Sequence, residues 1–234
     1  MLKTYKKGTV WYERDIRGVR TVADGLVFRY FADDDSPYLM TDKEMLEERK
    51  YIYDGKEKIK PYSKITMGID FGGNSSKTTF NLAGFLNNYQ DIRILEEDEL
   101  PLTDDIDAKA ICDKFIEFYR MAIDKYGRVD WIFPDSASTT MINSLRSAAK
   151  DAGLRYQNIK GCRKNEVSER PKTVDLLFNT GRLKINTRCT KTRRAIAMLR
   201  WDEKNPDIPE DKNIDNCNDR WDSFCYTWLD FVEF

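Results

Sequence analysis

The sequence has 234 residues, of which 41% are hydrophobic and 34% charged, and its formal net charge is −1. This length suits one sizeable domain or two small ones, and 12 Phe, 12 Tyr and 5 Trp residues provide enough apolar surface for a core, which argues against intrinsic disorder. No histidine is present, which excludes Ser-His-Asp and Cys-His catalysis and histidine-rich metal sites.

Cysteine content and hydropathy argue against several further classes of protein. The five cysteines include no CxxC pair, which argues against a zinc knot and against a disulfide framework. No apolar run approaches the ~18 residues of a membrane span, and MLKTYKKGTV lacks the apolar centre of a signal peptide. We therefore expect a protein that works in a cytoplasm and is not secreted.

Residues 1–64 are predicted to form an N-terminal extension of β-hairpins and charged chain. Short β-rich runs punctuated by glycine occur at GTVWYERDI, GVRTVAD and GLVFRYF. The charged segment Lys43–Tyr62 is predicted to be a surface helix or loop. We expect this extension to pack on a main domain at 65–234, so that the chain forms one globular unit.

Three strands and a long helix open the predicted main domain. The strands are Ile65–Asp70, Thr78–Leu86 and Ile92–Leu95, and the asparagine pair in FLNNYQDIR suits a hairpin turn between the second and third. The segment Asp104–Tyr126 has apolar residues at helical spacing behind an aspartate, Asp104 or Asp105, that can cap the helix.

Strands and helices alternate along the rest of the chain. Further strands are predicted at RVDWIFPD, LRYQNI and RLKINT, and helices at STTMINSLRSAAKDAG, ERPKTVDLLFNTG, KTRRAIAMLRW and Asp219–Phe234. Antiparallel meanders do not normally alternate in this way. We therefore predict an α/β fold with a mixed sheet flanked by helices on both faces.

The segment GIDFGGNSSKTT is open to three interpretations. A nucleotide-binding P-loop is excluded, because Phe71 and Ser76 stand where that motif needs glycines. A phosphate loop of the actin and sugar-kinase type fits IDFGGNSSKT better, but the later glycines are all isolated and supply no second loop. The third interpretation is a strand that ends in a metal-binding aspartate, Asp70.

Other acidic residues favour the third interpretation. Asp135 follows the apolar run of WIFPDSAS, and open sheets bind ligands at the carboxyl ends of their strands. Asp219 and Asp222 share a helix face at i and i+3, although together they could instead form a capping box. Two carboxylates ~4 Å apart repel by roughly 4 kcal/mol at an effective dielectric near 20, so a converging set calls for a cation. Oxygen ligands alone suit Mg²⁺ or Mn²⁺.

Charge is distributed unevenly along the second half of the chain. From Arg155 to Arg200 there are 13 Lys and Arg residues against 3 Asp and Glu, and from Trp201 to Asp222 there are 3 against 8. The two blocks could pair with each other on a solvated surface. Alternatively, a basic face for a polyanion lies beside an acidic cation site.

Taken in order, several motifs resemble those of the nuclease domain of phage terminase large subunits, in the RNase H-like (retroviral integrase) superfamily. The motifs are VADGLVFRYF, MGIDFGG, WIFPDSAS, TVDLLFNTGRLKIN with RRAIAMLRWDEK, and NCNDRWDSFCYTW. Each is short and degenerate, but their ordered combination covers nearly the whole chain. The resemblance implies an RNase H-like central mixed sheet.

The resemblance also implies a metal site. Asp70, Asp135 and Asp222 match the metal-binding aspartates, while Asn218 and Tyr226 match flanking positions. Asp219 stands where many relatives have histidine. We expect two ions per site, Mg²⁺ or Mn²⁺, bridged by Asp70, with Asp135 on one ion and Asp222, together with Asp219, on the other.

The implied activity is metal-dependent endonucleolytic cleavage of double-stranded phage DNA, including concatemer cleavage during genome packaging. Candidates for phosphate contacts are Lys160, Arg163, Lys164, Arg188, Lys191, Arg193 and Arg194, although several could instead pair with the acidic stretch Asp202–Asp215. The alternative is a non-catalytic DNA-docking module, whose carboxylates are caps and turn residues.

Partners and location follow from the same resemblance. They are the packaging ATPase domain of the same large subunit, the portal protein and the small terminase subunit, in the cytoplasm of an infected bacterial host. No P-loop occurs in this sequence. We therefore expect an isolated nuclease domain or a separately encoded nuclease part.

Overall fold

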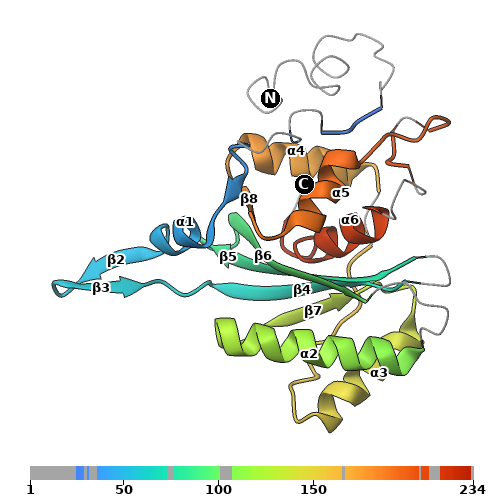
Figure 1. The fold of residues 1–234 in the computed structure, drawn as a ribbon, viewed down its shortest axis with the longest axis horizontal. Helices are drawn as coiled ribbons and strands as arrows, with labels where there is room; N and C mark the ends of the chain where they lie inside the picture. Colours follow the sequence, from blue (N-terminus) through green and yellow to red (C-terminus); the bar gives the residue numbers. More distant parts are fainter. Residues whose placement is uncertain are drawn as a thin grey trace.

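The computed structural model describes residues 25–28, 31, 36–72, 76–100, 107–164, 167–205, 207–210 and 217–232. These residues form a mixed sheet between two layers of helices (Figure 1). The strands are β1 (Leu39–Met40), β2 (Lys50–Tyr53), β3 (Lys56–Ile59), β4 (Lys64–Asp70), β5 (Thr78–Leu86), β6 (Asp91–Leu100), β7 (Trp131–Pro134) and β8 (Leu183–Asn186). The helices are α1 (Asp42–Glu47), α2 (Ala108–Tyr126), α3 (Thr139–Asp151), α4 (Glu169–Asn179), α5 (Thr190–Met198) and α6 (Cys217–Tyr226).

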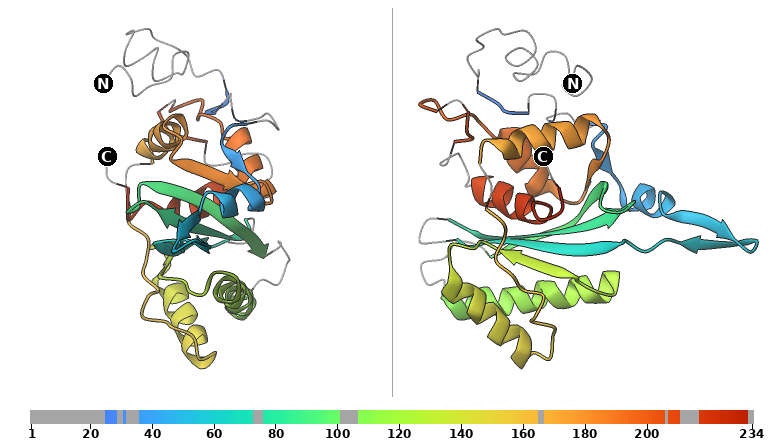
Figure 2. Two further views of the ribbon diagram at one scale, coloured as in Figure 1. Left: turned by 90° about the vertical axis from the view of Figure 1, so that its left-hand side faces the viewer. Right: turned by 180° about the vertical axis from the view of Figure 1, so that it is seen from behind.

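The main sheet has six strands in the order β1-β8-β6-β5-β4-β7, and β2 and β3 form a separate two-stranded sheet. Strands β4, β5 and β6 are antiparallel neighbours, whereas β7 runs parallel to β4 and β8 parallel to β6. Helices α4, α5 and α6 cover one face of the sheet, and α2 and α3 cover the other (Figures 1 and 2). The predicted mixed sheet with helices on both faces is confirmed.

The alternation of side chains along β4 explains how one strand serves both layers. Met67 and Ile69 are fully buried in the cluster that also contains Phe115 and Phe118 of α2. Successive side chains of a strand point to opposite faces, so Thr66, Gly68 and Asp70 face the layer that contains α6. Every residue of β5 is buried, as expected for a strand covered on both faces.

Most predicted elements of the main domain match the structure. The strand predicted at Thr78–Leu86 is confirmed at both ends, while β6 extends five residues beyond the predicted Leu95. Helix α2 begins after Asp107, whose carboxylate accepts a hydrogen bond from the Ala110 N–H at 2.7 Å, so Asp107 is its cap. Helix α6 begins at Cys217 and ends at Tyr226, earlier than predicted at both ends.

The strand predicted at LRYQNI is wrong. Within residues 154–159 only Ile159 forms a bridge, to Ile132 of β7. The side chain of Asn158 is fully buried and donates hydrogen bonds to the Val129 carbonyl and the Tyr119 hydroxyl. The segment is therefore a loop tied down by a buried amide.

The N-terminal prediction is tested only in part, because GTVWYERDI and GVRTVAD lie outside the described residues. The charged segment Lys43–Tyr62 was predicted to be a surface helix or loop. Only its beginning is helical, in α1, and the hairpin of β2 and β3 follows. Its turn at Asp54 and Gly55 has positive φ at both residues, 52° and 69°, which is typical of tight hairpins. No helix in the described part of the chain is long and apolar enough to cross a membrane.

Candidate functional site

Strands β4 and β7 end side by side at one edge of the sheet. Asp70 is the last residue of β4 and Asp135 directly follows β7. The strands are parallel, with Ile69 paired to Pro134, and the Asp135 N–H donates to the Ile69 carbonyl at 2.9 Å. The carboxyl ends of two neighbouring parallel strands thus bring these two aspartates together.

A glycine in β4 allows α6 to lie directly on the strand. A Cβ atom at Gly68 would stand 2.0 Å from the carbonyl oxygen of Ser223, closer than any real contact. The Thr66 hydroxyl donates to the Thr227 carbonyl at 2.7 Å and fixes the chain just beyond the helix. Because Asp70 shares this face of β4, the close approach brings Asp219 and Asp222 of α6 toward it.

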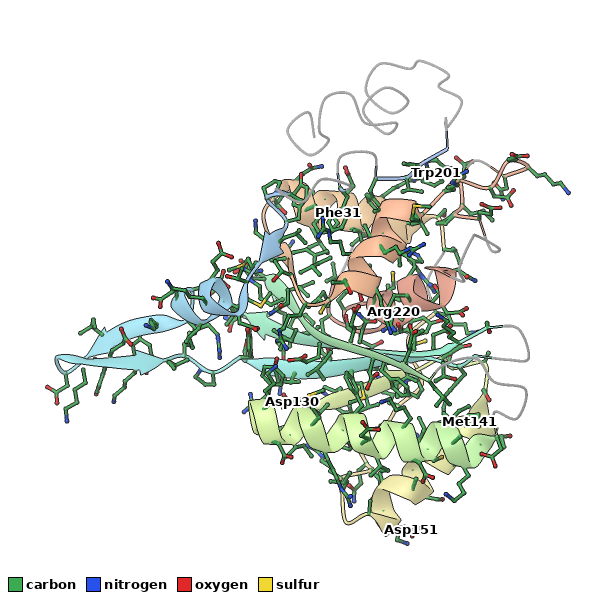
Figure 3. The ribbon with its side chains drawn as sticks, in the orientation of Figure 1. Phe31, Asp130, Met141, Asp151, Trp201 and Arg220 are labelled. Carbon is green, nitrogen blue, oxygen red and sulfur yellow. The ribbon has the colours of Figure 1, made fainter. Side chains whose placement is uncertain are left out.

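Buried polar groups fasten α6 to the sheet. The Thr79 hydroxyl donates to the Asp219 carbonyl at 2.9 Å, and the Ser223 hydroxyl donates to Asn81 Oδ1 at 3.0 Å. The Arg220 guanidinium donates to the Phe80 carbonyl at 2.7 Å and lies between α6 and the sheet (Figure 3). Buried polar networks with such partners hold one arrangement rather than many, so the helix and its aspartates are well fixed.

The four aspartates interact electrostatically. Burial, and then the negative charges of Asp222, Asp219 and Asp135, raise the pKa of Asp70 well above its ordinary value, while Arg170 opposes the rise. Such a shift means that ionising Asp70 costs free energy, because the charge is removed from water and is repelled by its negative neighbours. A bound cation would relieve both, and strongly perturbed carboxylates in this kind of setting are typical of functional sites.

Asp219 is buried inside the first turn of α6. Its Oδ2 accepts a hydrogen bond from the Lys77 N–H at 2.9 Å, which ties the helix to the segment that leads into β5. The capping-box alternative, with Asp219 as N-cap and Asp222 at N3, does not fit, because the helix begins two residues before Asp219. Asp135 does accept a local hydrogen bond, from the Ala137 N–H at 3.0 Å.

Arg170 of α4 was missed by the sequence analysis. It is buried, and its Nη1 donates to Asp222 Oδ1 at 2.7 Å. Its guanidinium carbon lies 5.6 Å from the ring centroid of Tyr226, the flanking tyrosine of the last motif. A signal was present, because Arg170, Val174, Leu177 and Phe178 follow the i, i+4, i+7, i+8 spacing of a buried helix face.

Oxygen ligands without histidine fit a hard divalent cation such as Mg²⁺ or Mn²⁺. The carboxylates are near enough to repel one another but are not gathered into a closed ligand set. Among the described residues, no three His, Cys, Asp or Glu side chains are placed so that they could hold an ion as they stand. The donor chemistry therefore fits a metal, and binding would require the side chains to draw together.

The candidate phosphate-binding residues fall into two groups, and some are already paired. Lys160, Arg163 and Lys164 follow the bridge at Ile159. Arg188 lies in the turn before α5, and Lys191, Arg193 and Arg194 lie in the first half of that helix. Lys160 pairs with Asp230 at 2.6 Å, Arg188 with Glu96 at 3.0 Å and with Asp42 at 2.7 Å, and Lys191 with Glu99 at 3.0 Å. These partners lie outside the acidic stretch that the sequence analysis considered.

Comparison with known proteins gives matches at the level of structure. A scan against protein-family models and a search of curated proteins found no match. A large terminase from a thermophilic bacteriophage superposes with a TM-score of 0.68 and 18% sequence identity, covering 98% of this chain and 50% of that one. The chain thus spans about half the length of that protein.

Separate nuclease domains match as well. The large terminase nuclease domain from bacteriophage SPP1 with bound Mn gives a TM-score of 0.51 at 16% identity, covering 73% of this chain and 88% of that one. The large terminase nuclease from thermophilic phage G20c with bound magnesium gives 0.53 at 12% identity, covering 88% and 98%. The chain therefore has the RNase H-like fold of the nuclease domains of phage large terminases.

Proposed function

We propose that this chain is a metal-dependent endonuclease that cuts double-stranded DNA, acting in phage genome packaging and the cleavage of concatemers. One observation carries the proposal: the charges of Asp135, Asp219 and Asp222 all act on Asp70 at the end of β4, the strand on which α6 packs at Gly68. The fold is that of large-terminase nucleases, two of which contain Mn or magnesium.

The chain's own residues hold the carboxylates in place. The Lys77 N–H fixes Asp219, and the Arg170 guanidinium orients Asp222. Arg170 also offsets part of the negative charge while no cation is bound. The buried phenol of Tyr226 stays protonated, because burial and then the charges of Asp222, Asp70 and Asp135 raise its pKa above the ordinary value.

Asp70, Asp135, Asp222 and Asp219 are the residues that would hold Mg²⁺ or Mn²⁺, in our proposal two ions. When bound, such ions activate water for attack on the phosphodiester and stabilise the leaving oxygen. Asp70 is the central ligand in this proposal, because the charges of the other three all act on it. The packaging ATPase domain, the portal protein and the small terminase subunit are the partners that a terminase nuclease would meet.

Plasmid cleavage tests the proposed function. We expect the wild-type chain to nick and linearise supercoiled plasmid with Mn²⁺ or Mg²⁺ and to be inert in EDTA. Asp70→Asn keeps the side-chain shape but removes the charge, and should lower cleavage by more than the roughly 10–100-fold that loss of an outer-shell partner of a metal ligand costs. Asp151→Asn is a matched control, since Asp151 is an exposed residue at the end of α3 (Figure 3).

Equal cleavage by wild type and Asp70→Asn would contradict the proposal. The alternative function, a non-catalytic DNA-docking module, is favoured by a different result. In that case the wild type would bind duplex DNA and would not cut it with either metal.

A further inference from the structure

The hairpin of β2 and β3 projects from the end of the molecule opposite the carboxylate site (Figures 1 and 2). It pairs only with itself in the sheet topology, and residues 51–60 are all exposed. Two-stranded hairpins are marginally stable alone, and this one adds nothing to either core cluster. Its side chains are therefore available for another molecule.

Apolar exposure is concentrated on this hairpin. Five large hydrophobic side chains are exposed in the described part of the chain, and four of them, Tyr51, Ile52, Tyr53 and Ile59, belong to it. Scattered exposed residues need no explanation, but a cluster marks an interaction surface. The chemistry of the two faces decides what kind of partner fits.

The strand register sorts the hairpin into two different faces. Tyr51 is paired with Lys58 and Tyr53 with Lys56, so these four residues share one face, which we call the lysine–tyrosine face. The opposite face carries Lys50 with Ile59, and Ile52 with Glu57. The lysine–tyrosine face contains no acidic residue.

The lysines of the two faces differ in their partners. Lys50 is bound to Glu47 at 2.9 Å and to Glu57 at 3.2 Å. Within the described residues, no ion pair includes Lys56 or Lys58. The Lys58 ammonium lies 4.3 Å from the centroid of the Tyr53 ring, a cation–π contact that orders the face without neutralising it.

We propose that the lysine–tyrosine face of this hairpin is a second contact for duplex DNA, remote from the carboxylates. Unpaired lysines and tyrosine hydroxyls are donors to phosphate oxygens, and a two-stranded ribbon has the dimensions to enter the major groove. A protein partner would be expected to cover the face with Ile52 and Ile59 instead, because lysine is depleted in protein interfaces. The inference rests on the proposed function, since duplex DNA is its substrate.

The position of the hairpin sets a length for the bound DNA. Four residues separate β3 from β4, and β4 runs seven residues to Asp70. At ~3.3 Å per residue, the strand, the connection and the hairpin together span roughly 40–50 Å. A duplex of about 12–15 base pairs covers this distance, so shorter duplexes cannot contact the hairpin and the carboxylate site together.

DNA binding in EDTA tests the hairpin separately from cleavage. Fluorescence anisotropy with a labelled duplex of about 30 base pairs, roughly three helical turns, is measured over a range of salt concentrations. Lys56→Gln with Lys58→Gln should weaken binding several-fold and reduce the salt slope by about 2, since each phosphate contact contributes about 0.9. Lys56→Arg with Lys58→Arg should restore both values.

Two matched controls complete the design. Lys109→Gln with Lys150→Gln removes the same charge from exposed residues of α2 and α3, and should leave the salt slope nearly unchanged. Ile52→Ser with Ile59→Ser alters the opposite face and should leave DNA binding unchanged. The proposal would be overturned if the Lys56/Lys58 and Lys109/Lys150 variants changed DNA binding equally. It would also be overturned if only the Ile52/Ile59 variant weakened DNA binding.

The outcome can be separated from that of the nuclease proposal. Wild type that binds DNA through the hairpin in EDTA but cuts nothing with Mn²⁺ would refute the nuclease activity and keep the hairpin contact. If wild type cuts DNA but substitution of the hairpin lysines does not change DNA binding, the nuclease activity is kept and the hairpin contact is refuted.

Discussion

Arg170 of α4 and Asp222 of α6 form a partly buried ion pair, with Nη1 2.7 Å from Oδ1, and both side chains act electrostatically on Asp70. The pair joins two helices of the same layer, and the arginine is nearly inaccessible while 33% of the Asp222 side chain is exposed. The structure thus supplies one positive charge where the proposed cations would supply more. Arg170 is a positioning residue in this account.

Arg170→Met should destabilise the metal-free protein, because it removes the positive charge that is paired with Asp222 and that opposes the other negative charges acting on Asp70. Breaking a fully buried pair costs about 3–5 kcal/mol, and the partial exposure of Asp222 reduces the expected loss to about 1–3 kcal/mol. Mn²⁺ should recover much of this loss by taking over the charge. Urea unfolding with and without Mn²⁺ measures both effects.

Lys172→Met is the control for that experiment. Lys172 lies on the same helix in a half-exposed i, i+3 pair with Glu169, and surface pairs contribute about 0–1 kcal/mol. A loss in Arg170→Met that Mn²⁺ does not change, or an equal loss in Lys172→Met, would contradict the role given to Arg170.

Gly68→Ala should displace α6, because the added Cβ meets the Ser223 carbonyl at 2.0 Å and backbone cannot yield cheaply. Overpacking of this kind costs about 1–3 kcal/mol. We expect lower stability together with loss of plasmid cleavage and of stabilisation by Mn²⁺, since Asp219 and Asp222 move away from Asp70.

Gly84→Ala provides the comparison. Gly84 lies in β5 of the same sheet, and its added Cβ would meet the Tyr62 ring at 2.6 Å, away from the carboxylates. This variant should lose stability and keep the Mn²⁺ effect. If Gly68→Ala also kept the Mn²⁺ effect, the close approach of α6 to β4 would not be what assembles the site.

Glu99 gives a pH dependence of stability. Burial alone would raise its pKa, but hydrogen bonds and attraction from Lys191, Lys77 and Arg220 outweigh burial and lower it from 4.5 to about 2. A lowered folded-state pKa contributes stability that is full above about pH 4.5 and is lost as the pH falls toward 2. Urea midpoints measured across this range should therefore fall less steeply in Glu99→Gln than in wild type.

Glu117→Gln should keep the wild-type slope, because Glu117 is exposed in an i, i+3 pair with Lys114. Equal slopes in wild type and Glu99→Gln would show that this cluster of charges does not contribute to acid sensitivity.

Local patterns were sufficient for most of the main domain. The strand β5 and the helix α2 were both predicted from the sequence, α2 because its apolar residues recur at helical spacing. The predicted strands that precede Asp70 and Asp135 placed both residues at strand ends. That these two strands are parallel neighbours depends on the topology of the sheet. The sequence pattern indicated a mixed sheet but did not give the order of its strands.

Long-range pairing explains what the sequence could not predict. Arg188 contacts Glu96 across 92 positions, and Arg170 contacts Asp222 across 52. No local spacing distinguishes such arginines from phosphate-binding ones. The loop at LRYQNI alternates like a strand, yet the buried amide of Asn158 fixes it in another conformation.

The central claim is that the four aspartates form a divalent cation site, and melting of wild type and Asp70→Asn over a range of Mn²⁺ concentrations tests it most directly. Without metal, the charge of Asp70 is disfavoured by burial and by repulsion from three other carboxylates. Asp70→Asn removes this cost, so the metal-free variant should melt at a higher temperature than metal-free wild type. Mn²⁺ should raise the wild-type midpoint by several degrees and leave the variant nearly unchanged. A variant that melts lower than wild type without metal and gains an equal shift with Mn²⁺ would contradict the claim.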